Sequence, residues 1–210
     1  MKDVIIVGAG GFGREVYGYI EDAIKNGAQW RIKGFLDDNP AALDKYDYPV
    51  KTIFPLSQYQ PAEGDVFACA IGTPKIKKAV VEKLKARGAK FTTLVHSSAF
   101  VGRNVSIGEG CVVCPNCVLT CDCKIGDFVM LNVGTSVGHD SQIGAWATLS
   151  SHCDVTGFAQ VGEGAFFASS VAVIPSSKVG DWARVGINSS VIIKVRDGSN
   201  VFGNPAVKLK

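Results

Sequence analysis

Residues 125–148 read IGDFVM LNVGTS VGHDSQ IGAWAT, four six-residue blocks that each begin with Ile, Leu or Val. The same spacing continues in both directions and gives sixteen consecutive hexads over residues 101–196. A fixed short period of this kind is typical of a parallel β-helix, in which about three hexads form one triangular coil. Each residue n then lies about 4.8 Å, one strand spacing, from residue n + 18. The sequence therefore predicts a parallel β-helix of about five coils.

The hexads also account for most of the seven cysteines. Cys111, Cys114 and Cys117 are spaced as C-x-x-C, a pattern that in an intracellular protein can indicate a zinc site. However, Cys111, Cys117, Cys123 and Cys153 all occupy the fifth position of a hexad, where a free cysteine serves as a small apolar side chain. Successive fifth positions belong to different faces of the triangle, so these thiols cannot easily converge on one ion. We expect free cysteines and no metal.

Composition limits the partners. The chain has 22 basic and 19 acidic residues in 210, a net charge of +3, which gives no reason to expect nucleic acid or an anionic membrane as partner. A small molecule is the better expectation. The N-terminal run MKDVIIVGAGGFG is interrupted by glycines too early for a signal sequence or a membrane span, so we predict a cytoplasmic protein.

The residues before the hexads follow a different pattern. Residues 2–23 read as an apolar strand, a glycine turn and an amphipathic helix, and the turn matches G-x-G-x-x-G at Gly8, Gly10 and Gly13. Backbone N–H groups at such a turn favour a phosphate. The next strand ends at Asp37 and Asp38, where a carboxylate can bind a ribose hydroxyl.

A third strand at residues 65–72 and a basic helix at 73–88 lead to a last strand at 91–96. We therefore predict two domains. Residues 1–96 form a small Rossmann-like domain that binds a nucleotide, and residues 97–210 form the β-helix with a C-terminal extension. NAD, a nucleotide sugar, or a glycine turn with no ligand are all compatible with the first domain.

Half a nucleotide-binding fold followed by hexads resembles one family. The stretches VIIVGAGGFGREV, GFLDDN, AIGTPKIKK, VGHDSQIG and VFGNPAVKLK occur here in an order that is similar to the sialic acid O-acetyltransferases and the nucleotide amino-sugar N-acetyltransferases that act on bacillosamine or perosamine. The resemblance implies a left-handed β-helix, a homotrimer with active sites between neighbouring chains, and direct acetyl transfer from acetyl-CoA to a UDP-, GDP- or dTDP-linked sugar. Handedness comes from the resemblance alone.

The family's general base and its acidic partner match His139 and Asp140. A sugar hydroxyl or an ammonium is a poor nucleophile toward a thioester, so a neutral imidazole must take its proton, and a carboxylate orients the ring. One coil further, Gly157 lies in the same column as His139. Its family counterpart offers a backbone N–H to the thioester oxygen, which stabilises an oxyanion.

The resemblance assigns the remaining site residues. Phe12 stands where many relatives have a histidine that contacts the sugar, and Thr148 stands where some have a histidine that contacts CoA. These differences leave the identity of the acceptor sugar open. Toward the nucleotide sugar we expect Gly10, Gly11, Phe12, Asp37, Asp38, Thr73 and Asn132. Toward acetyl-CoA we expect Thr148, Gly157, Ser169 and Ile187.

Several alternatives stay open. Cys121 lies one coil before His139, and a thiol beside a base can form an acyl-enzyme. The chain could also be a trimeric nucleotide sensor or scaffold without catalysis, or an NAD-linked enzyme. We expect His96 and His152 to be structural. The sequence does not decide between nitrogen and oxygen as the acceptor atom, or the length of the acyl chain.

Overall fold

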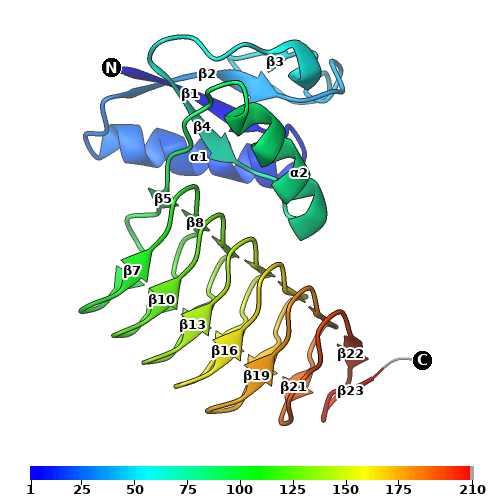
Figure 1. Cartoon of the computed structure of the whole chain (residues 1–210). Helices are drawn as coiled ribbons and strands as arrows, with labels where there is room; N and C mark the ends of the chain where they lie inside the picture. Colours follow the sequence, from blue (N-terminus) through cyan, green and yellow to red (C-terminus); the bar gives the residue numbers. More distant parts are fainter. Residues whose placement is uncertain (209–210) are drawn as a thin grey trace.

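The computed structural model describes residues 1–208 and divides them into an α/β domain and a long prism (Figure 1). The α/β domain contains one parallel sheet in the order β3-β2-β1-β4, two helices and a short 3-10 helix. Its elements are β1 (Lys2–Val7), α1 (Gly11–Lys25), β2 (Trp30–Leu36), β3 (Thr52–Ile53), η1 (Leu56–Gln58), β4 (Asp65–Cys69) and α2 (Pro74–Lys85). No helix within residues 1–208 is long and apolar enough to cross a membrane.

The prism has three faces, and each is a sheet of two- or three-residue strands. One sheet comprises β5 (Leu94–Val95), β8 (Val112–Val113), β11 (Met130–Leu131), β14 (Thr148–Leu149), β17 (Phe166–Phe167), β20 (Arg184–Val185), β22 (Asn200–Phe202) and β23 (Val207–Lys208). The six-stranded sheet comprises β6 (Phe100–Val101), β9 (Val118–Leu119), β12 (Ser136–Val137), β15 (Asp154–Val155), β18 (Ala172–Val173) and β21 (Ser190–Val191). The five-stranded sheet comprises β7 (Ser106–Ile107), β10 (Lys124–Ile125), β13 (Gln142–Ile143), β16 (Gln160–Val161) and β19 (Lys178–Val179).

The predicted register is confirmed. Parallel pairs join residues 18 apart throughout the regular coils, as in Ser136 with Asp154 and Val137 with Val155. The first hexad position points inward, and so does the fifth, where Cys111, Cys117 and Cys123 are at most 1% exposed. These cysteines are packing residues of the prism interior, and all seven cysteines are free.

The last coil departs from the period. Val195 forms a bridge with Val179, and Arg184 pairs with Asn200, so both offsets are 16 residues rather than 18. The hexad expected at 191–196 is therefore two residues short, and the expectation of sixteen regular hexads is wrong at its last member. After it, β23 turns back antiparallel on β22 and ends the described chain.

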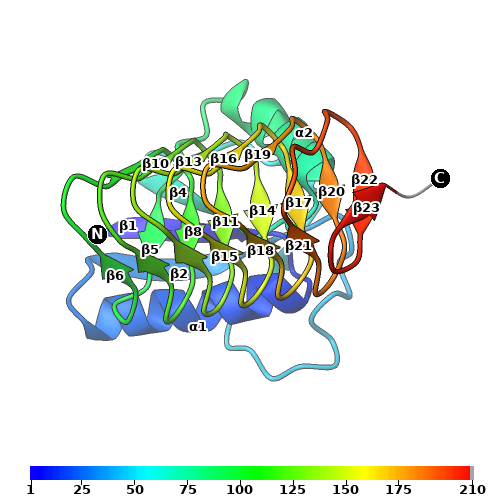
Figure 2. The same cartoon turned by 90° about the horizontal axis from the view of Figure 1, so that it is seen from below.

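The α/β domain covers the eight-stranded sheet and leaves the other two sheets free (Figures 1 and 2). Outward-facing residues of this sheet are buried where the domain lies on them, as at Met130 and Thr148. The Lys77 ammonium of α2 is 1% exposed and donates hydrogen bonds to the Ala147 carbonyl (3.2 Å) and the Thr148 hydroxyl (3.0 Å). An aromatic ladder that includes Phe91, Phe128 and Trp146 joins the two units beside it.

The β-helix begins slightly before the expected boundary at residues 96 and 97. Residues 91–96 were expected to close the α/β sheet, but only Phe91 bridges to Phe67 there, and β5 already pairs with β8 of the prism. Leu209 and Lys210, at the end of the second predicted domain, lie outside the described residues. The fold class predicted from the sequence, a Rossmann-like α/β domain followed by a left-handed parallel β-helix, is confirmed.

Candidate active site

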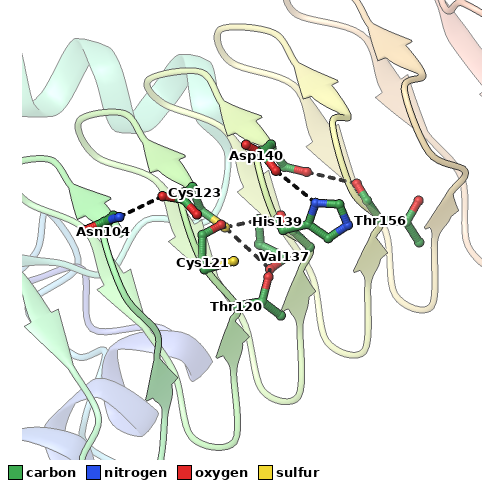
Figure 3. Close-up of polar contacts among 11 residues, drawn as sticks. Asn104, Thr120, Cys121, Cys123, Val137, His139, Asp140 and Thr156 are labelled. Atoms are coloured by element: carbon green, nitrogen blue, oxygen red, sulfur yellow. Dashed lines mark hydrogen bonds and ion pairs between the residues drawn. The ribbon is translucent and has the colours of Figure 1, made fainter.

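His139 and Asp140 lie at the edge of the prism between the six-stranded and five-stranded sheets, in the turn that joins β12 to β13 (Figure 3). We call this the His139 edge. Asp140 has the left-handed backbone conformation, with φ of 60°, which is the rule at this turn position in the prism. Its carboxylate lies 2.9 Å from Nδ1 of His139. Nε2 of His139 has no hydrogen-bond partner among residues 1–208, so this ring nitrogen is open to an incoming ligand.

Gly157 lies against the imidazole from the next coil. A Cβ built on Gly157 would come 2.6 Å from Nε2 and 2.7 Å from Cε1 of His139, closer than any real contact. The glycine is therefore required by the position of the ring and not by its own backbone, because the left-handed residue of this turn is Phe158. The column predicted from the 18-residue period brings His139 and Gly157 together.

Cys121 lies in the same column on the preceding coil (Figure 3). The Asp140 N–H donates to its carbonyl at 3.2 Å. The neighbouring Asp122 carboxylate, by hydrogen bonding and by its charge, raises the pKa of the Cys121 thiol, and Asp140 adds to this. A thiol attacks as its thiolate, so these carboxylates oppose the acyl-enzyme alternative.

The three glycines of the G-x-G-x-x-G turn have different roles. A Cβ on Gly13 would lie 2.0 Å from the Gly8 carbonyl oxygen, so Gly13 lets α1 approach the end of β1. A Cβ on Gly10 would meet no atom within 4 Å, and Gly10 is exposed at the N-cap of α1. Packing within the chain thus requires Gly13 but does not require Gly10.

Asp37 and Asp38 lie beside this turn at the end of β2. One Asp37 oxygen accepts the Ala9 N–H at 2.7 Å and the other accepts the Asn39 N–H at 2.9 Å. Asp38 accepts the Leu56 N–H at 3.0 Å. Each carboxylate keeps lone pairs for a ribose hydroxyl, but both also hold loops in place.

The other predicted contacts of the α/β domain surround the same edge of the sheet. Gly11 and Thr73 are exposed at the starts of α1 and α2. They lie at the same edge of the sheet because β1 and β4, which precede these helices, are neighbouring parallel strands. Phe12 is half-buried and packs against the main hydrophobic core. Part of the Phe12 ring is thus in contact with the core and only the remainder can contact a ligand.

Three predicted site residues lie on a different edge from His139. Asn132, Ser169 and Ile187 follow strands of the eight-stranded sheet, so they line the edge between the eight-stranded and six-stranded sheets. We call this the Asn132 edge. The six-stranded sheet separates it from the His139 edge within one chain. A single chain therefore does not bring all the predicted residues together.

Thr148 does not reach either edge. Its side chain is 3% exposed beneath α2, where its hydroxyl accepts a hydrogen bond from the Lys77 ammonium. Contact with acetyl-CoA, expected from the resemblance, would require α2 to leave the prism. Thr148 is accordingly left out of the proposed site.

Phe158 is a further residue at the His139 edge that was not predicted from the sequence. Its ring is perpendicular to the His139 imidazole with centroids 5.0 Å apart, and it is 55% exposed. Because Phe158 follows Gly157 in the chain, the 18-residue column was a signal that could have identified it. Within residues 1–208 there is no group of three or more His, Cys, Asp and Glu residues arranged to hold a metal ion.

The fold and the edge that carries His139 define a hexapeptide-repeat β-helix protein of the left-handed class with an α/β domain before the helix. Residues 3–84 match the family described as the PglD N-terminal domain. The chain is 34% identical over 118 residues to the UDP-N-acetylbacillosamine N-acetyltransferase of Bacillus subtilis (strain 168). That stretch spans 54% of this chain and 51% of the relative, about half of each.

Several solved structures match over the whole chain, including the following two. The acetyltransferase domain of PglB from Neisseria gonorrhoeae FA1090 is 25% identical with a TM-score of 0.88, and the match covers 100% of both chains. PerB from Caulobacter crescentus is 27% identical with a TM-score of 0.88, over 100% of this chain and 98% of that one. The resemblance to the nucleotide amino-sugar N-acetyltransferases, expected from the sequence, is confirmed by these comparisons.

Proposed function

We propose that this chain is an acyltransferase that moves the acetyl group of acetyl-CoA directly to a nucleotide-linked sugar. The observation that carries the proposal is the His139 imidazole, held by Asp140 at Nδ1 and resting on Gly157 with Nε2 unpaired. The related proteins are named N-acetyltransferases, which favours an amino group over a hydroxyl as the acceptor. PerB was solved with CoA and GDP-perosamine, which supports the same pair of ligands here.

In the proposed reaction His139 is the general base. Nε2 takes a proton from the sugar nitrogen as that nitrogen attacks the thioester carbonyl carbon, and Asp140 stabilises the imidazolium that forms. A carbon–nitrogen bond forms, the carbon–sulfur bond breaks, and the CoA thiolate leaves with the proton that His139 has taken. The products are the acetamido sugar and free CoA, and no acyl-enzyme is involved.

Gly157 is the proposed oxyanion donor. Its N–H donates no hydrogen bond within residues 1–208, and it lies in the backbone directly below the imidazole. An N–H in that place supports the negative charge that develops on the thioester oxygen. The lack of a side chain at this position leaves space for both the ring and the thioester.

The nucleotide is proposed to lie on the α/β domain. The open space around Gly10 supports the approach of a diphosphate to the backbone at the start of α1, and Asp37 beside this turn is the proposed partner of the ribose. The acceptor is thus a nucleotide-linked sugar with UDP, GDP or dTDP as carrier. The names of the relatives include both UDP- and GDP-linked sugars.

A complete site needs two chains in this proposal. The α/β domain and Asn132 lie along the eight-stranded sheet, whereas His139 lies on the opposite edge of the same prism. If the His139 edge of one chain meets the Asn132 edge of the next, three chains close a ring. Each of three equal sites then contains His139 and Gly157 from one chain, with Asn132, Ser169 and Ile187 from its neighbour. We propose a cytoplasmic homotrimer that acts in polysaccharide biosynthesis.

The test is a product search by mass spectrometry. The protein is incubated with acetyl-CoA and a panel of UDP-, GDP- and dTDP-linked sugars, with and without amino groups. We expect one acetylated amino sugar, and a loss of about a hundredfold or more with His139→Ala. Full turnover by His139→Ala refutes the assignment of the base. No product from a folded trimer across the panel refutes the reaction and favours a nucleotide sensor, while tight NADH binding favours an NAD-linked enzyme.

A further inference from the structure

The His139 imidazole lies in an exposed place and yet must point in one direction. Its side chain is 54% exposed and that of Asp140 is 45% exposed. A hydrogen bond between two such exposed side chains contributes little to fixing a conformation. The Asp140 carboxylate alone is therefore a weak restraint on the ring.

Two further contacts come from the next coil. The ring rests on the backbone of Gly157, where a side chain would collide with it. The Phe158 ring then stands perpendicular to the imidazole at 5.0 Å between centroids, a favourable arrangement for two aromatic rings. Gly157 permits this position of the imidazole, and Phe158 is the side chain that favours it.

The backbone at Phe158 has the left-handed conformation of its turn position, as it does at Phe128, Trp146 and Trp182. Phe158 has φ of 61°, the left-handed region, which is unfavourable for a bulky side chain. Its N–H donates to the His139 carbonyl at 2.9 Å, which ties the two residues together across the coils. The side chain is 55% exposed, so burial in the prism does not explain it.

We propose that Phe158 is a positioning residue for the general base. It holds the imidazole of His139 over Gly157, so that Nε2 faces the acceptor instead of turning into solvent. The inference rests on the proposed function for its effect on turnover. The contact between Phe158 and His139, however, is testable without it.

The first measurement is of the ring itself. The chain contains three histidines, so imidazole resonances of ¹³C-histidine-labelled protein can be assigned by single substitutions. The Phe158 ring current displaces the His139 resonances, and Phe158→Gly moves them toward free histidine while Phe158→Tyr retains the displacement. Unchanged His139 resonances in Phe158→Gly overturn the inference, whatever the activity of the protein.

The second measurement is turnover. Losing an aromatic contact of this kind reduces the share of correctly placed rings by about 3- to 10-fold, so kcat falls by that factor in Phe158→Gly while both KM values stay unchanged. Phe158→Tyr restores kcat. The matched control is Ser176→Gly, which makes the same backbone change one coil further, where φ is also 61°. An equal loss in the control, or full kcat in Phe158→Gly, overturns the positioning role.

The two measurements separate the possible failures. If His139→Ala keeps full turnover, the proposed function is wrong, and the shifted resonances still establish the contact. If His139→Ala is inactive and Phe158→Gly is fully active, only the positioning role is wrong. Since glycine tolerates the left-handed conformation, we expect Phe158→Gly to keep its folded state, which circular dichroism and thermal unfolding verify.

Discussion

Replacing Gly157 by alanine tests the site with a single methyl group. The added Cβ would lie 2.6 Å from Nε2 and 2.7 Å from Cε1 of His139, whereas ordinary contacts begin near 3.4 Å. The backbone of Gly157 is outside the left-handed region, so alanine fits it without strain. The collision is therefore with the imidazole alone, and the imidazole is the group that has to move.

The required movement is about 1 Å, and a misplacement of that size costs about 100-fold in rate. Because the ring is the exposed end of a side chain, it can move at little cost, and we expect the free energy of unfolding to change by less than about 0.5 kcal/mol. The assay is the initial rate of acetylated product, with thermal unfolding of the same preparation.

Gly138→Ala provides the contrast. There the new Cβ would come 2.7 Å from the Gly157 backbone nitrogen, which cannot move aside, so this variant is expected to unfold at lower temperature. Full turnover by a folded Gly157→Ala protein would refute the role of the ring in its present position. A Gly157→Ala protein that unfolds as early as Gly138→Ala would refute the argument that only a side chain moves.

Four further variants test other parts of the structure. Gly10→Ala should raise KM for the nucleotide sugar by about tenfold and leave the stability unchanged, because the surroundings of Gly10 are open. Gly13→Ala should destabilise the domain by about 2 kcal/mol or more, because its Cβ would meet the Gly8 carbonyl oxygen. Equal stability of the two variants would contradict this. Cys121→Ser should keep kcat within about twofold, since no acyl-enzyme forms, and an acetylated wild-type cysteine in an intact mass would argue against it. Burial lowers the pKa of Lys77 from 10.5 to about 8, so its burial costs about 3 kcal/mol below pH 8 and the cost disappears as pH rises to 10.5. The free energy of unfolding of the wild type, measured in urea relative to that of Lys77→Met, should therefore rise by about 3 kcal/mol between about pH 7 and about pH 10.5. A difference between the two proteins that stays constant with pH would show that the ammonium is not buried as a charge.

The period made most of the prism predictable. Cys111 and its equivalents could be placed inside, and His139 above Gly157, because a strict repeat fixes both which way a residue points and its neighbours in space. The prediction failed at the last coil, where the six-residue spacing changes. Four residues separate Val191 from Val195 instead of six, and the letters VIIKVR still fit a hexad, so nothing in the composition signalled the shorter coil.

Contacts between the two domains were the part that the sequence left open. Thr148 occupies an outward-facing hexad position, and the pattern is the same on all three faces of the prism. Only the docking of α2 decides that this face is covered and that Thr148 meets Lys77. Phe158 was missed for a related reason: its hexad position tolerates many residues, and the direction of its ring depends on the neighbouring coil.

The shortened last coil and the returning strand β23 also affect how the prism ends. A coil of regular length would present the unpaired N–H and C=O groups of its strands to any other β-helix, and such edges promote end-to-end aggregation. Here the strand that follows β22 runs antiparallel, is two residues long and carries Lys208. A second prism therefore finds no parallel template along the eight-stranded sheet, and this device opposes end-to-end growth of a highly repetitive fold on that face.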